Sequence, residues 1–72
     1  MYLYKNNTRY RAIVTVQVQS TENPKKALQI GSKAPLVCEA ELGFTDCDVG
    51  PGESIVLINN TQATIVTIRN AP

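Results

Sequence analysis

The chain has 72 residues, of which 43% are hydrophobic and 18% are charged, and its formal net charge is +1. A chain of this length buries only about 60% of its unfolded surface on folding, which leaves few residues for a substrate cleft. It contains no histidine, which excludes Ser-His-Asp and Cys-His nucleophile systems and the commonest general acid–base side chain. We therefore predict one small domain over residues 1–72 that is not an enzyme and needs no cofactor.

Two absences bear on location. No apolar run approaches the roughly 20 residues that a membrane helix needs. The first residues, MYLYKNNTRYR, lack the hydrophobic segment and small-residue cleavage site of a signal peptide. Both absences favour a cytoplasmic protein without a membrane partner, although a mature secreted domain with an added start codon would have the same features.

Charge is divided unevenly along the chain. Residues 1–33 hold six basic residues and one acidic residue, a balance of +5, whereas residues 34–72 hold one basic and five acidic residues, a balance of −4. Such a division creates patches of opposite sign unless the two halves pair with each other. Pairing of the two halves is the simpler expectation.

The N-terminal part predicts two strands and a turn. A short strand over Tyr2–Lys5 is followed by Asn6-Asn7-Thr8 and a long strand over Arg9–Gln19. Small apolar residues alternate along the long strand, which indicates one buried face; they are Ala12, Val14, Val16 and Val18. Because asparagine tolerates positive φ, the Asn-Asn pair predicts a hairpin turn between the two strands.

A short helix is predicted next, over about residues 24–30. Asn23 is a suitable N-cap, Pro24 suits the first helical position, and Gly31 can end the helix in a left-handed conformation. An irregular loop is the alternative for this segment.

The rest of the chain predicts further strands separated by turns. Gly50-Pro51-Gly52 fits a type II turn. The Asn59-Asn60-Thr61 triplet echoes the first Asn-Asn-Thr, and turn chemistry explains both triplets better than the glycosylation pattern that they also match. The four strands expected here are Ala34–Leu42, Phe44–Val49, Glu53–Ile58 and Gln62–Arg69. The predicted fold is mainly β, a small six-stranded antiparallel barrel or orthogonal sandwich with one short helix.

One cluster of residues is typical of a binding surface. All three tyrosines lie near basic residues, and stacked rings beside cations are what single-stranded nucleic acid requires. The alternative is that the tyrosines cover one sheet face while the charges keep the other in solvent. The candidate residues are Tyr2, Tyr4, Lys5, Arg9, Tyr10, Arg11, Lys25 and Lys26.

Two other features, a group of acidic residues and the two cysteines, are considered as possible metal or disulfide sites. Asp46 and Asp48 with Glu53 contain a fragment of a calcium loop, but calcium needs six to eight oxygens, so a solvated acidic turn is the better interpretation and no metal is predicted. A hairpin at residues 42–43 would set Cys38 opposite Cys47; two buried thiols are favoured over a disulfide.

The resulting hypothesis is a non-enzymatic binding or assembly module that acts through protein–protein contacts or self-association. Strands rich in valine, isoleucine and threonine can pair edge to edge with a partner. A small accessory protein of a virus or mobile element fits this description. The alternative is a single-stranded nucleic-acid or RNA-binding barrel that uses the tyrosine–basic N-terminal hairpin.

Overall fold

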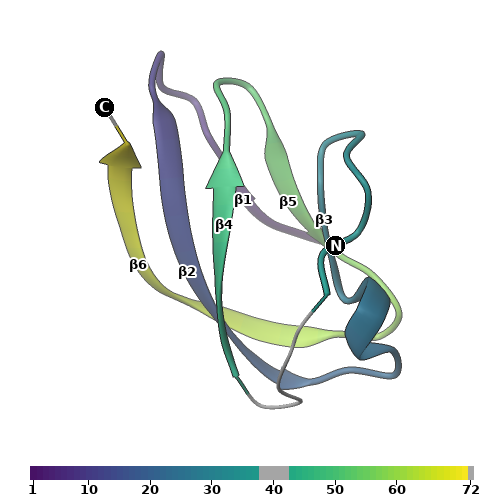
Figure 1. Cartoon of the computed structure of the whole chain (residues 1–72). Coiled ribbons are helices and arrows are strands. Elements are labelled where there is room, and N and C mark those ends of the chain that lie inside the picture. The colour runs from purple at the N-terminus through teal and green to yellow at the C-terminus, as the bar shows by residue number, and fades with distance from the viewer. Residues whose placement is uncertain (38–42, 72) are drawn as a thin grey trace.

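The computed structural model describes residues 1–37 and 43–71, and it is mainly β (Figure 1). Within these residues, six strands form two three-stranded antiparallel sheets with the orders β1-β5-β3 and β4-β2-β6. The mainly β prediction is therefore confirmed. The strands are β1 (Tyr2–Lys5), β2 (Arg11–Ser20), β3 (Leu28–Ile30), β4 (Phe44–Val49), β5 (Ser54–Leu57) and β6 (Gln62–Ala71), and a 3-10 turn, η1, spans Pro24–Lys26.

Strand β2 is the centre of its sheet, because it pairs with β4 along one edge and with β6 along the other. The predicted alternation along this strand is confirmed, since one face is buried and the other is partly or fully exposed. The buried face consists of Ala12, Val14, Val16 and Val18. Branched side chains pack well on such a pleated surface, and their burial supplies much of the driving force for folding.

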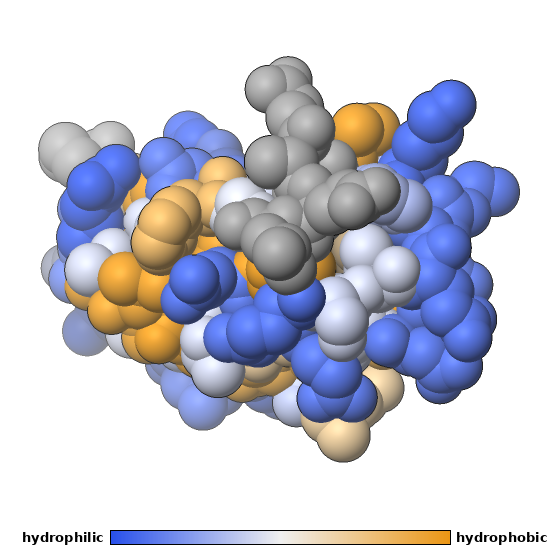
Figure 2. Space-filling model, turned by 90° about the horizontal axis from the view of Figure 1, so that it is seen from below, coloured by the Kyte–Doolittle hydropathy of each residue, from blue (hydrophilic) through white to orange (hydrophobic). Residues whose placement is uncertain are grey.

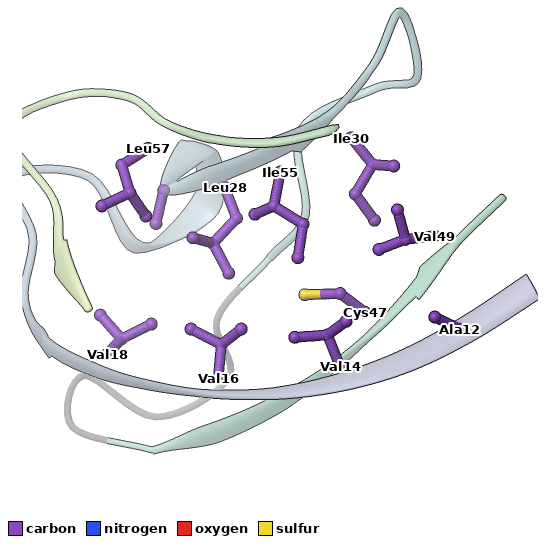
Figure 3. Close-up of a cluster of buried hydrophobic side chains, with 11 residues drawn as sticks. Ala12, Val14, Val16, Val18, Leu28, Ile30, Cys47, Val49, Ile55 and Leu57 are labelled. Carbon is purple, nitrogen blue, oxygen red and sulfur yellow. The ribbon is translucent and has the colours of Figure 1, made fainter. Parts of the chain in front are cut away.

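The core lies between the two sheets. In Figure 3 the row of side chains from β2 points toward side chains of β3 and β5 on the opposite sheet. Two residues of β4, Cys47 and Val49, join the same cluster. The facing residues from the other sheet are Leu28, Ile30, Ile55 and Leu57. Each sheet thus buries one face against the other, as layered β structures require.

The predicted N-terminal hairpin is wrong. Strand β1 pairs with β5 and not with β2, so residues 6–10 carry the chain from one sheet to the other. Leu3 and Tyr4 pack against the core from this position. Turn residues specify that the chain reverses, but the burial of apolar side chains decides which strands pair.

The second Asn-Asn turn is present, although it too joins strands of different sheets. Asn59 and Asn60 have φ angles of +55° and +53°, the left-handed conformation that asparagine tolerates. The turn is closed by the Thr61 amide, which donates to the Ile58 carbonyl at 3.2 Å. The conformation was predictable from the two asparagines, whereas the separation of β5 from β6 was not.

The predicted helix over residues 24–30 is also wrong beyond its first turn. Asn23 does cap η1, since its side chain accepts from the Lys25 amide at 3.0 Å. The chain then enters β3, where Leu28 and Ile30 are buried and pair with β5. A seven-residue helix gains little from propensity alone, so pairing and burial determine the structure here.

The turn before β5 has the predicted form. Gly52 has a φ of +78°, and the Glu53 amide donates to the Gly50 carbonyl at 3.1 Å, as in a type II turn. The strand predicted over Ala34–Leu42 is not seen in its described part, where Leu36 forms a single bridge with Leu28. The remainder of that prediction, residues 38–42, lies outside the described residues.

The side chain of Asn6 is fully buried where the chain passes between the sheets. Its Nδ2 donates to the carbonyls of Tyr10 at 2.7 Å and Val49 at 2.9 Å. Its Oδ1 accepts from the amide of Thr8 at 3.0 Å and from the hydroxyl of the same residue at 2.6 Å. Both amide protons and the carbonyl oxygen are therefore satisfied, as burial of a polar group requires.

The backbone of Asn6 is held equally firmly. Its amide donates to the Glu53 carbonyl at 2.9 Å, and its carbonyl accepts from the Gly52 amide at 2.8 Å. One residue thus joins the connection between β1 and β2 to the connection between β4 and β5.

Replacing Asn6 with alanine should lower the free energy of unfolding by about 2–4 kcal/mol, because it leaves the buried Val49 carbonyl without its donor and removes the side-chain hydrogen bonds to Tyr10 and Thr8. Chemical denaturation would measure the loss. The neighbouring Asn7→Ala is the matched control, because Asn7 is exposed, and its effect should stay within about 0.5 kcal/mol. Equal effects of the two substitutions would contradict the role assigned to Asn6.

Candidate functional site at the β6 edge

Among the described strands, β6 has the most exposed residues. This strand has ten residues and, among the described strands, pairs only with β2. Its N-terminal half alternates between exposed and half-buried residues, whereas the five residues from Val66 to Asn70 are all exposed. A run that is exposed on both faces and along one edge offers its unpaired amides and carbonyls to a further strand.

The exposed run also carries apolar side chains. Ile68 lies opposite Val14 in the register between β2 and β6, so it belongs to the inner face of the sheet. Val14 is fully buried, but Ile68 is 48% exposed. The second sheet therefore covers β2 and leaves this part of β6 uncovered.

Val66 is the second exposed apolar residue of this run. It is the extra residue of a bulge, since Thr67 pairs with Thr15 while Ile65 pairs with Val16, and it is 47% exposed. Figure 2 shows hydrophobic atoms gathered on one side of the molecule, the side on which β6 lies in Figure 1, while the opposite side is mostly hydrophilic.

Most sheet edges in monomeric proteins carry features that prevent pairing, such as lysine, proline or a bulge. Residues 62–68 contain no charged residue and no proline. The single charge of β6 is Arg69, which lies 4.0 Å from Asp46 of β4. Apart from its one bulge, the strand therefore has little protection against edge-to-edge pairing.

The charged residues on the outer face of the same sheet pair with one another. Arg11 and Asp48 form a two-point ion pair, in which the arginine Nε donates to Oδ1 at 3.1 Å. The hydrogen bond from Arg11 and its charge lower the pKa of Asp48 below its ordinary value. The Thr15 hydroxyl donates to Asp46 at 2.6 Å. Each of the four charged residues described on this face, Arg11, Asp46, Asp48 and Arg69, therefore has a partner of opposite charge.

A second ion pair fixes the turn between β4 and β5. The Glu53 carboxylate accepts from the Gly50 amide at 2.7 Å and from Lys33 at 3.2 Å. The Gly50 bond and then the lysine lower the pKa of Glu53. A Cβ atom at Gly50 would lie 2.7 Å from the carboxylate, so a side chain at this position would displace the Glu53 carboxylate.

The two oppositely charged halves of the chain do pair with each other. Two of the three ion pairs among the described residues join a basic residue of the first half to an acidic residue of the second, namely Arg11–Asp48 and Lys33–Glu53. This matches the simpler expectation for the charge division. The basic residues without an ion pair in the described part of the chain are Lys5, Arg9, Lys25 and Lys26.

The structure brings only some of the tyrosine–basic candidates together. Arg9 and Tyr10 lie in the loop before β2, and Tyr10 is 62% exposed. Lys25 and Lys26 lie on η1, at the opposite end of the molecule (Figure 1). The candidates therefore do not form one continuous surface.

The remaining candidates lie on β1 and at the start of β2. Tyr2 is 75% exposed and pairs with Val56, whereas Tyr4 packs partly against the core. Lys5 is exposed at the end of β1. Arg11 already contacts Asp48. Of the eight candidates, the exposed aromatic rings are thus Tyr2 and Tyr10.

The acidic residues and the cysteines singled out in the sequence can be compared with the structure in turn. Within residues 1–37 and 43–71, no group of three His, Cys, Asp or Glu residues is placed to hold a metal ion. Cys47 is fully buried and points into the core opposite Val14 (Figure 3). Cys38 lies outside the described residues, so the relation between the two cysteines stays a prediction.

Comparisons of the chain with protein-family models, with curated protein sequences and with solved structures found no significant match. In the part of the chain that the structure describes, no helix has the length and apolar character needed to cross a membrane. We therefore infer function from the geometry of the chain itself.

Acid should destabilise the fold through Glu53. Because its pKa is lower in the folded chain than its ordinary value of 4.5, the stabilisation is complete above that value and is lost as the pH falls through the folded-state pKa. Denaturation between pH 7 and pH 2 would follow this loss.

Two variants isolate the cause. Glu53→Gln should flatten this pH dependence, and Lys33→Met should flatten it less, because the Gly50 amide makes the larger contribution to the shift. An unchanged acid profile in Glu53→Gln would contradict the assignment.

Proposed function

We propose that the protein is a non-enzymatic binding or assembly module that docks a protein by adding a strand to β6. The observation that supports this most is the open edge of β6, where Val66–Asn70 are exposed and the strand pairs with β2 alone among the described strands. In strand addition, main-chain hydrogen bonds supply affinity and alternate side chains supply specificity. The module is the small barrel or orthogonal sandwich that the sequence predicts, built on the two sheets.

The size of the edge supports the proposal. At about 3.3 Å per residue, a strand of this length spans roughly 33 Å, enough for a partner strand of ordinary length. Ile68 would give such a strand an apolar contact on the inner face, and Val66 is a second exposed apolar residue on the same edge. Burial of a half-exposed valine or isoleucine contributes about 1 kcal/mol, given about 1.5–3 kcal/mol for complete burial.

The absence of histidine and the small size of the chain support a binding role over catalysis. We also propose that the protein is cytoplasmic and that it is a small accessory protein of a virus or mobile element.

Affinity capture from the native host should recover a protein partner or further copies of the chain, with bound protein and nucleic acid both identified. Ile68→Lys should reduce the recovered protein by about tenfold or more, because it places a charge at the centre of the docking edge. Phe44→Lys is the matched control, since Phe44 is 65% exposed on β4, the other edge strand of the same sheet. Equal capture by both variants would contradict docking at β6.

Single-stranded nucleic acid is a second candidate ligand. The observation that favours it is that the exposed rings Tyr2 and Tyr10 share the N-terminal segment with Lys5 and Arg9. These two basic residues have no ion pair among the described residues. Rings of this kind stack on bases of any sequence, and the cations neutralise phosphates. The wide separation of Lys25 and Lys26 from Tyr10 weakens this candidate.

If nucleic acid is the ligand, a fluorescent single-stranded oligonucleotide should bind at low salt, and binding should weaken steeply as salt is added. Tyr10→Ala and Arg9→Ala should each reduce affinity, the tyrosine change by about tenfold. Phe44→Ala removes an exposed ring elsewhere and should have no effect. No binding at low salt would exclude this candidate.

A further inference from the structure

We propose that the strand added to β6 is β6 of a second copy of this chain, in antiparallel register about a two-fold axis at Ile68. This inference rests on the proposed function, because it names the partner for the same edge. The two copies would form one continuous sheet with the strand order β4-β2-β6-β6-β2-β4. Such isologous pairing closes on itself and yields a dimer.

The exposed run of β6 is symmetric about this axis. It extends from Val66 to Asn70, and Ile68 is its middle residue. Antiparallel pairing about Ile68 sets that residue opposite itself, Val66 opposite Asn70, and Thr67 opposite Arg69. Every pairing in this window uses residues that are exposed in the single chain.

The register also keeps the faces of the two strands matched. Ile68 and Asn70 pair with the buried Val14 and Ala12 of β2, so both belong to the inner face. Thr67 and Arg69 pair with residues of the outer face of β2. Ile68 therefore meets its copy on the inner face, and Thr67 meets Arg69 on the outer face, a match that a one-residue shift would reverse.

Charge selects the same register. Arg69 is the only charged residue of β6, and in this register it faces the hydroxyl of Thr67 while its own Asp46 lies 4.0 Å away. An axis at Arg69 would set two guanidinium groups opposite each other, which is unfavourable. An axis at Thr67 would set Arg69, on the outer face, against Ile65, on the inner face.

The small core gives a reason for the second copy. A single core in a chain below about 70–80 residues rarely supplies more than about 3–5 kcal/mol, and oligomerisation is one of the usual additions. Here the half-exposed Ile68 side chains would contact each other across the axis, with Cβ atoms about 4.5–5.5 Å apart. The edge would thereby complete an apolar surface that the chain alone leaves uncovered.

Light scattering or sedimentation over a range of concentrations tests the proposal. The intact chain should reach twice the 7.9 kDa mass of one chain as concentration rises. Ile68→Lys should raise the dissociation constant by about tenfold or more, because it sets two like charges opposite each other on the axis. Phe44→Lys should dimerise as the unaltered chain does, and circular dichroism would verify that both variants fold.

Cross-linking tests the register directly. Ile68→Cys should form a disulfide-linked dimer under mild oxidation, because each new thiol faces its copy. Thr67→Cys should not, because it faces Arg69 of the second copy. The unaltered chain, treated in parallel, gives the background from Cys38 and Cys47.

A chain that stays monomeric at all concentrations would overturn the second copy as the partner. A dimer that survives Ile68→Lys, or one that Thr67→Cys links and Ile68→Cys does not, would also overturn it. The proposed function is tested separately, since a different protein captured by the intact chain and lost in Ile68→Lys would leave docking at β6 standing.

Discussion

The hydrogen bonds of Asn6 are the constraint on which the arrangement of the two sheets depends. This residue begins the connection after β1, and its side-chain amide donates to the carbonyl of Tyr10, just before β2, and to that of Val49, at the end of β4. Its backbone bonds to the turn before β5. Ends of four of the six described strands, β1, β2, β4 and β5, therefore lie beside one satisfied polar group, which is costly to bury and correspondingly specific in its partners.

The position of β6 follows from this arrangement. Because β1 is directed to the second sheet, it does not occupy the edge next to β6, and β2 is left with β4 and β6 as its neighbours. The second sheet covers the valine row of β2 but leaves Ile68 half exposed. The polar outer face pairs its own charges. The open edge is thus a consequence of how the core is built, and it motivates both the proposed docking role and the proposed pairing of two copies.

Local features of the fold could be predicted from the sequence, but pairing between strands could not. The alternation along β2, the type II turn at Gly52 and the conformation of Asn59 follow from residue types and short-range sterics. The helix expected after Asn23 became β3 because burial of Leu28 outweighs a weak local propensity. The burial of Asn6 depends on Val49, which is 43 residues away, so no local pattern indicates it. The absence of charge from residues 62–68 is visible in the sequence. Only the strand order shows that these residues lie on the edge of a sheet.

Amide hydrogen exchange, resolved by residue, tests the central claim most directly, because it reports on β6 itself. If two copies pair through this strand, exchange of the Val66–Asn70 amides that point away from β2 should slow as the chain is concentrated. Amides at the β2–β4 pairing should not change by this mechanism, since both strands are already paired within one chain. Exchange rates along Val66–Asn70 that are equal in dilute and concentrated solution would contradict the account.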